Sequence, residues 1–287
     1  MNLCSKVGIS LDVLMKNCFF VTDQGSNFKN ALSNFHRLPC VCHMLATVIR
    51  HTLQLSDLSK TILPMKEDDV QMEQLNKIRE TVSAIKNVIA FLKRSGLSEK
   101  ILTGLKQFNE TRWNSTFIML KSFDESYQQI QDVLQKYNQE DRLSNIDSSV
   151  FKCLINFLQP FYNATLFFEG DKYPTMHRVY MWCVKLQRTM STCTTDSPLL
   201  MFLKKRGAMA LQERFEIMPL HKVALFLNPK FKSMAALGNP EREEVIALVK
   251  CLLQILKMPA CVQRNDHTYP PPPAKIPRQF SIDDEFD

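Results

Sequence analysis

Asp23 is the first residue whose type and position suggest a metal-binding site. It follows the short apolar run Cys18–Thr22 and opens a polar stretch that ends at Asn27. A run that is apolar on both faces predicts a buried parallel strand, and α/β sheets build their sites at the carboxyl ends of such strands. A carboxylate held there suits the metal ions that stabilise in-line displacement at phosphorus. The alternative interpretation is that Asp23 only caps the turn or helix that follows it.

Cys40, Cys42 and His43 form a second group, at the end of another short run predicted as a strand, Leu38–Val41. The stretch between the two predicted strands is long enough for a parallel crossover. At the start of a helix, His43 can donate to a phosphate oxygen, and the helix dipole adds attraction for the anion. The alternatives are a solvated histidine or a zinc site. Zinc is disfavoured because it needs four ligands and the sequence offers no second Cys/His cluster.

Arg112 and Trp113 form a third group, just before or at the start of a predicted helix. Arginine pairs with phosphate groups, and tryptophan offers a face on which a base can stack. The competing interpretation is that Trp113 anchors its helix in the core. The sequence leaves both interpretations open.

The elements that must position these groups are read from the pattern of apolar residues. The two short strands are joined by a helix that Ser26 or Asn27 caps and that runs through Leu32. After Cys42 the apolar residues recur at helical spacing. Gly96 ends one of the helices. Beyond the helix that follows Cys42, helices are predicted at Val70–Lys93, Trp113–Tyr137, Val150–Phe168, Met176–Met190, Leu199–Phe215 and Glu241–Leu256.

Composition narrows the class of protein. The net charge is +7 although the stretch from Ser281 onwards carries four acidic residues and no Lys or Arg. A basic body fits a polyanionic partner such as nucleic acid, as it also fits an ordinary basic intracellular protein. Nine irregularly spaced cysteines indicate reduced thiols and an intracellular location. The N-terminus lacks a signal-peptide pattern, and no apolar run has the length of a membrane span.

Four stretches together resemble the hAT transposases, the family of Hermes and hobo, and the BED-finger proteins derived from them. The resemblance extends from about Val7 to Lys250, and Tyr173-Pro-Thr175 also falls where helical insertions of the family place such a run. The four matching stretches are Val21–Asn27, Cys40–Leu45, Thr111–Leu120 and Val223–Lys232.

The resemblance implies a role for each group. Asp23 would end a strand of an RNase H-like sheet as the second of three catalytic carboxylates, and would hold a metal ion there. His43 would lie by the scissile phosphate. Trp113 would stack on a base flipped out of the duplex, with Arg112 beside it. The implied partner is DNA and the implied location is the nucleus.

The departures from the family pattern matter for catalysis. Only 22 residues precede Asp23, and no strand ending in a catalytic aspartate fits among them. Residues after Met258 match nothing that would supply the family's catalytic glutamate. The BED-type finger and the dimerisation segment of the family are also missing, so we interpret the chain as truncated at both ends. Because one carboxylate cannot hold two metal ions, we expect no DNA cleavage or strand transfer by this chain.

We therefore predict a mostly α protein with a small α/β part, an incomplete RNase H-like sheet followed by a large helical insertion domain. Residues 1–60 would form the α/β remnant. Residues 61–258 would form the helical region, including the Arg-Trp helix, and residues 259–287 a Pro-rich, acidic, disordered tail. Two strands alone are marginal, so helices or a partner chain must cover them.

The predicted function is that of a transposase-derived, catalytically inactive nuclear protein that binds DNA weakly or contacts other proteins. Two alternatives remain: a fragment of an active hAT transposase, and a protein-interaction module without a nucleic-acid role. We expect no cofactor in this chain, with Mg²⁺ needed only by a longer active form. DNA is the expected partner, a second copy or another protein is a further candidate, and neither a membrane nor a small-molecule substrate is expected.

Overall fold

The computed structural model describes residues 15, 18–54, 69–102, 104–106, 113–170 and 173–256. The chain separates into two compact units, Met1–Ile246 and Ala247–Asp287. In the second unit, residues 247–256 are the described part, and they are helical. The expected tail at 259–287 and the position of Arg112 lie outside the described residues.

The sheet consists of β1 (Phe19–Thr22) and β2 (His36–Pro39), which pair in parallel with Phe19 opposite His36 and Thr22 opposite Pro39. The helix α3 (Ser26–Ala31) forms the crossover between them. The parallel pairing confirms the prediction. Two details of that prediction were wrong: β2 begins two residues earlier than expected, and Gly25 rather than Ser26 or Asn27 is the N-cap of α3. The pairing ends at Thr22 and Pro39, and the Cys40 N–H donates to the Thr22 carbonyl just beyond this pair.

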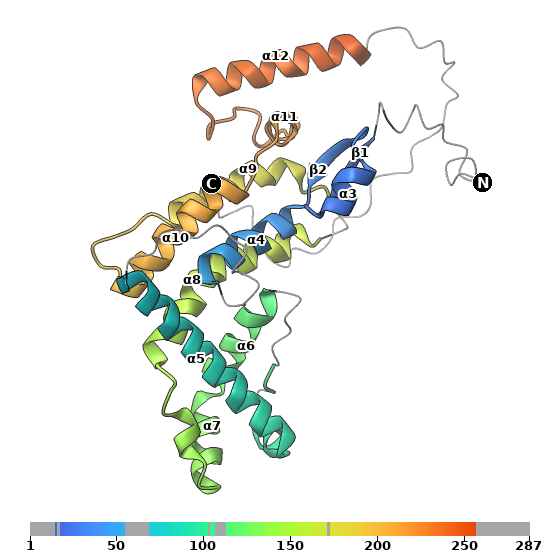
Figure 1. Cartoon of the computed structure of the whole chain (residues 1–287). Helices are drawn as coiled ribbons and strands as arrows, with labels where there is room; N and C mark the ends of the chain where they lie inside the picture. The colour runs from blue at the N-terminus through green and yellow to red at the C-terminus, as the bar shows by residue number, and fades with distance from the viewer. Residues whose placement is uncertain are drawn as a thin grey trace, which may run out of the picture. The chain divides into compact units, whose positions relative to one another are not determined.

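A helical body follows the sheet, and Figure 1 shows α4 lying beside α8 and α10. The face of α4 predicted from the sequence is the buried one: Met44, Leu45, Val48, Ile49 and Leu53 are all at most 3% exposed. The longer helices are α4 (Val41–Leu53), α5 (Asp69–Arg94), α6 (Asn114–Glu125), α7 (Tyr127–Lys136), α8 (Ser148–Phe168), α9 (Val179–Thr189), α10 (Pro198–Arg214), α11 (Pro219–Leu227) and α12 (Asn239–Leu256). Short 3-10 turns are η2 (Leu97–Lys100), η3 (Glu140–Leu143) and η4 (Met176–Arg178).

One expected helix is broken. The pattern predicted a continuous helix over Trp113–Tyr137, but Ser126 leaves the helical conformation with φ −104° and ψ 3°, so that α6 ends and α7 begins there. Rings on both sides of the break meet Phe151 of α8: Phe123 from α6 at 5.7 Å and Tyr127 from α7 at 5.8 Å between ring centroids.

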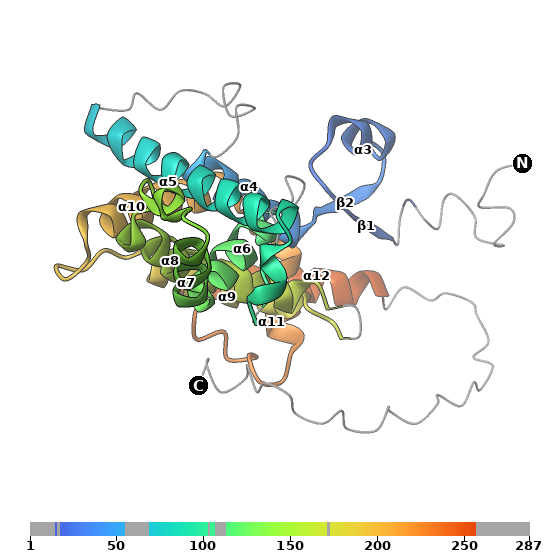
Figure 2. The ribbon, with the colours of Figure 1, turned by 90° about the horizontal axis from the view of Figure 1, so that it is seen from below.

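α8 and α10 are the central helices of this body, and each begins with a side-chain cap. Asp147 accepts from the backbone N–H groups of Ser149 and Val150 at the start of α8, and Ser197 accepts from Leu200 at the start of α10. Seen from below, α10 lies along α8 on the side away from α6 (Figure 2). The sequence analysis did not predict α11 as a helix, because it treated the stretch Val223–Lys232 only as a family motif.

The fold is therefore mostly α with a small parallel sheet, as expected. None of the described helices has the length and apolar character needed to cross a membrane. The sequence-based boundary near residue 60 stays a prediction.

Candidate nucleic-acid interface

Asp23 lies directly after β1 and is half-buried. Its Oδ1 accepts the backbone N–H of Gly25 at 2.9 Å, which closes a turn between strand and helix. A Cβ atom at residue 25 would lie 2.9 Å from the same oxygen, so a larger residue there would displace the Asp23 carboxylate from this position. The turn-capping role of Asp23 is thus present in the structure, whereas its role as a metal ligand stays a prediction.

Arg37 of β2 fixes the backbone next to Asp23. Its guanidinium donates to the carbonyl oxygen of Asp23 at 3.1 Å, to Thr22 Oγ1 at 3.4 Å and to the Gln24 side-chain oxygen at 3.4 Å. One arginine therefore ties the end of β1 to the neighbouring strand. The sequence analysis missed Arg37, because its importance depends on the register that places Arg37 opposite Phe20.

The starts of α3 and α4 leave the sheet at the same end. Cys40 donates its backbone N–H to the Thr22 carbonyl at 2.7 Å, directly beyond the last paired residues of the two strands. His43 is exposed in the first turn of α4. Parallel pairing thus brings the backbones that carry Asp23 and His43 to one edge. That the two side chains lie close together and face DNA remains a prediction.

Trp113 is half-buried at the N-cap of α6, a position between the two interpretations offered by the sequence. The adjacent Asn114 donates its amide to the Glu169 carboxylate at 3.4 Å, which links the start of α6 to the end of α8. The stacking role of Trp113 and its orientation towards Asp23 stay predictions.

The two cysteines before His43 differ in their surroundings. A hydrogen bond from Cys42 lowers the pKa of the Cys40 thiol far below its ordinary value, and His43 lowers it further, against the effect of burial. The same hydrogen bond and burial raise the pKa of Cys42, as do the charges of Cys40 and Glu169. Within the described ranges, no three His, Cys, Asp or Glu side chains are grouped so that they could hold a metal ion.

The positive charge of the chain is concentrated in one region. Residues 173–238, from η4 to the turn before α12, contain ten Lys and Arg and three Asp and Glu. Residues 69–170 contain twelve of each. The excess in 173–238 equals the net charge of +7, so all other parts of the chain together are neutral. An excess of positive charge of this size attracts polyanions.

Part of this charge stabilises the fold. Arg206 is 4% exposed and donates to the carbonyl oxygens of Thr52 at 3.0 Å and His51 at 3.2 Å, at the end of α4. Arginine at the C-terminus of a helix satisfies its last carbonyls and complements its dipole. Arg178 is also 4% exposed, and its guanidinium lies over the Phe231 ring at 4.3 Å from the centroid. These two arginines hold helices together and are inaccessible to a large ligand.

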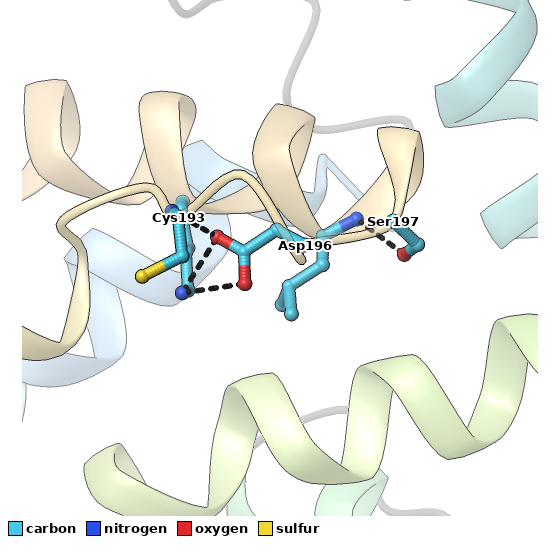
Figure 3. A network of polar contacts seen from close by, with 5 residues as sticks. Cys193, Asp196 and Ser197 are labelled. Atoms are coloured by element: carbon cyan, nitrogen blue, oxygen red, sulfur yellow. Dashed lines mark hydrogen bonds and ion pairs between the residues drawn. The ribbon is translucent and has the colours of Figure 1, made fainter.

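An ion pair also organises the loop between α9 and α10. The Lys204 ammonium lies 2.8 Å from Asp196 Oδ2, and the same carboxylate accepts the backbone N–H of Cys193 at 2.7 Å. Figure 3 shows this network and the adjoining Ser197 cap. The hydrogen bond from Cys193, followed by that from Lys204, holds the pKa of Asp196 below its ordinary range. Lys204 is thereby neutralised inside the fold.

The remaining charge is presented to solvent. Lys222 is partly neutralised by Glu241, whose Oε1 lies 2.6 Å away. The exposed positive residues are Arg188 at the end of α9, Lys205 and Arg214 of α10, and Lys230 and Lys232 after α11. We call Arg188, Lys205 and Lys232 the exposed basic set. Their exposed charges suit contacts with phosphate groups.

The chain is similar in sequence to two transposases and to a zinc finger protein. No protein-family model matches the chain. The Hobo transposase of a Drosophila melanogaster transposable element is 24% identical over 242 residues, which cover 83% of this chain and 33% of the transposase. The AC transposase of Zea mays is 24% identical over 252 residues, 79% of this chain and 28% of that protein. Zinc finger protein 618 of Homo sapiens is 24% identical over 190 residues, 66% of this chain and 19% of that protein.

These relatives confirm the resemblance read from the motifs. The chain spans a third or less of the length of each of them. What the whole relatives do is therefore not transferred to this chain by similarity alone.

Proposed function

Because this chain is related to the hAT transposases, we propose that it is a transposase-derived nuclear protein that binds DNA without cutting it. The observation that carries this proposal is the concentration of the net charge of +7 in residues 173–238, with the exposed basic set at its surface. Phosphate contacts supply most of the affinity of sequence-independent DNA binding, so an exposed basic set favours such binding. The names of two relatives, transposases, support DNA as the polyanion.

The proposal extends to the origin of the fold. β1, α3 and β2 would be the part of an RNase H-like sheet that ends in Asp23, and the helices from α5 onwards would be its helical insertion. The parallel pairing of β1 with β2 and the position of Asp23 at the strand end support this assignment. His43 and the Arg112–Trp113 pair would be inherited contacts to DNA on the same side.

Absence of catalysis is proposed for a chemical reason. In-line displacement at phosphorus with two metal ions needs several carboxylates, and the motifs of this chain supply Asp23. The Asp23 carboxylate already accepts the Gly25 N–H, which favours a capping role. Asp23 would hold Mg²⁺ only in a longer, active form of the protein, and no cofactor is proposed for this chain.

The first experiment measures binding of the purified chain to a labelled DNA duplex as a function of salt. We expect weak binding whose logarithm falls linearly with the logarithm of salt concentration. An Asp23→Ala variant should bind equally well or slightly more tightly, because it removes a negative charge near the phosphates. Absence of binding at low salt would contradict the proposal and favour a protein-interaction module.

The second experiment tests catalysis. The chain is incubated with nicked or hairpin-competent DNA in Mg²⁺ or Mn²⁺, and the strands are resolved on a denaturing gel. We expect no cleavage. Cleavage by the wild-type chain that disappears in Asp23→Ala would show that other carboxylates complete the site, for example from a second copy.

A second candidate is that the sequence forms part of an active transposase. The supporting observation is that the chain matches 33% of the Hobo transposase. Cloning the full transcript and repeating the cleavage assay with any upstream coding sequence separates this candidate from the first.

A further inference from the structure

The last turn of α8 contacts the starts of both α4 and α6. Glu169, the C-cap of α8, accepts a hydrogen bond at 3.4 Å from the side-chain amide of Asn114, the first residue of α6. The Thr165 carbonyl, one turn earlier in α8, lies 4.0 Å from the sulfur of Cys42 in the first turn of α4. One turn of α8 therefore touches both helices whose starts carry proposed DNA contacts.

The start of α6 needs such an anchor. Its N-cap is Trp113, and an indole N–H can only donate, so this side chain cannot accept from the free backbone N–H groups of the first turn. One turn further on, Phe117 is 1% exposed and its ring stacks on Tyr162 of α8 at 4.5 Å between centroids. Apolar packing thus fixes α6 from Phe117 onwards, and the Asn114–Glu169 hydrogen bond ties down the turn before it.

The charge of Glu169 suits a position between these helix ends. A carboxylate at the C-terminal end of its own helix is disfavoured by the helix dipole, whereas the N-terminal ends of α4 and α6 attract it. Cys40, burial and the charge of Glu169 raise the pKa of the Cys42 thiol, so the field of this carboxylate reaches the first turn of α4. The two neighbouring helices, rather than α8, therefore favour the carboxylate at this place.

We propose that Glu169 is a positioning residue that holds the start of α6, and with it Trp113, on the same turn of α8 that contacts the start of α4, which carries His43. The inference rests on the proposed function, because it makes Trp113 and His43 parts of one DNA-contacting surface. Glu169 acts through Asn114 and is not itself a phosphate contact. Since its negative charge repels DNA, any gain in binding that it provides comes from the placement of Trp113.

Two substitutions separate the charge of Glu169 from its hydrogen bond. Glu169→Ala and Glu169→Gln remove the same charge, but the glutamine amide oxygen can still accept the Asn114 amide. The difference between the two variants therefore measures the hydrogen bond alone. In an Asn114→Ala background, which lacks the donor, this difference should vanish.

Acrylamide quenching of tryptophan fluorescence reports on Trp113 without DNA. The chain has two tryptophans, and Trp182 is 1% exposed, so the quencher reaches mainly the half-buried Trp113. We expect stronger quenching in Glu169→Ala than in the wild-type chain, and quenching near the wild-type value in Glu169→Gln. Asn114→Ala should resemble Glu169→Ala. Circular dichroism establishes that each variant is folded, and Asn114→Ala supplies the same comparison if Glu169→Ala does not fold.

Binding to a labelled DNA duplex is then measured for the same variants. We expect Glu169→Ala to bind about fivefold more weakly than Glu169→Gln, as for the loss of one hydrogen bond. The slope of log affinity against log salt should be the same for both, because no phosphate contact differs between them. Glu125, exposed at the far end of α6, provides the matched control: its Ala and Gln variants should bind alike.

The two measurements distinguish failure of this inference from failure of the proposed function. Equal quenching in Glu169→Ala and Glu169→Gln would overturn the positioning role, whatever the DNA affinity. A difference in quenching with equal DNA affinities would overturn the assignment of Trp113 to the DNA-contacting surface. A difference in quenching in a wild-type chain and variants that bind no DNA would support the placement of Trp113 by Glu169 and contradict the proposed function.

Discussion

Residues 69–170 and 173–238 are both helical, yet they use charged side chains differently. The first region contains twelve positive and twelve negative residues, and pairs such as Lys77–Glu73 lie at its surface with 51% and 61% of their side chains exposed. The second region contains ten positive and three negative residues and buries two arginines. The balanced region is held together mainly by apolar burial, as in the face of α5 that carries Ile78, Ile85 and Ile89.

The difference shows that the net charge of a region is larger than the positive charge that its surface offers to a polyanion. Arg206 and Arg178 are buried in the fold, and Lys204 and Lys222 face carboxylates. Five of the ten positive residues of this region are exposed, and the other five are buried or half-buried. DNA binding and stability should therefore depend on different members of the same basic region.

The largest expected effect is on stability, at Arg206. An Arg206→Met variant keeps the bulk of the side chain but leaves the carbonyls of His51 and Thr52 without their donor. We expect a loss of about 3 kcal/mol in the free energy of unfolding, measured by urea denaturation. The matched variant Lys205→Met removes an exposed charge one residue away and should cost less than about 0.5 kcal/mol. Similar losses for both variants would show that Arg206 does not act through its buried hydrogen bonds.

The next effect concerns His221, which is 2% exposed in α11. Its Nδ1 accepts the backbone N–H of Met218 at 3.1 Å, and burial lowers the pKa of His221 to about 4. Since the folded pKa lies below the unfolded one, the contribution is complete above pH 6.5 and is lost as pH falls towards 4. We expect a loss on the order of 3 kcal/mol over this window, from urea denaturation at a series of pH values.

A His221→Gln variant cannot titrate in that window and should show a much flatter dependence of stability on pH. The same substitution at His51, whose pKa burial also lowers, measures what a second histidine contributes. If His221→Gln retained the full wild-type dependence, another group would have to be responsible.

DNA binding should separate the two regions more sharply than stability does. Replacing Arg188, Lys205 and Lys232 together by Ala should lower the slope of log affinity against log salt by about 0.9 for each phosphate group that is no longer neutralised. The matched control replaces Lys93, Lys121 and Lys152, which are exposed in the balanced region. The control should leave the slope nearly unchanged. Equal effects of both triple variants would mean that DNA is attracted by total charge rather than by residues 173–238.

The sequence predicted those parts of the molecule that depend on local patterns. The apolar spacing of Met44, Leu45 and Val48 identified the buried face of α4, and the run before Asp23 identified β1. Each of these patterns extends over only a few residues, and the spacing of apolar residues in it predicts which face is buried.

The features that sequence reasoning missed depend on contacts between distant residues. Arg206 lies 154 residues from Thr52, and nothing near it in sequence distinguishes it from the exposed Lys205. Arg37 gains its role from the register of β2 against β1. The break at Ser126 has no counterpart in the apolar pattern, which continues across it. The candidate site residues Asp23, His43 and Trp113 came from family motifs, and their roles stay predictions.

The smallest expected effect concerns the ion pair between Lys222 and Glu241, which offsets charge at the edge of the basic region. The hydrogen bond from Lys222 holds the pKa of Glu241 below its ordinary value. A lowered acidic pKa adds stability above the unfolded pKa, and that stability is lost as pH falls from the ordinary value through the lowered one.

The Glu241 side chain is 40% exposed and that of Lys222 21%, so solvent screening limits the coupling to less than about 1 kcal/mol. A double-mutant cycle of Lys222→Met and Glu241→Gln, by urea denaturation near pH 7 and near pH 3, should show coupling at the higher pH that vanishes at the lower. Raising the salt concentration should weaken it. Coupling that persisted near pH 3 would show that packing, rather than charge, joins these two side chains.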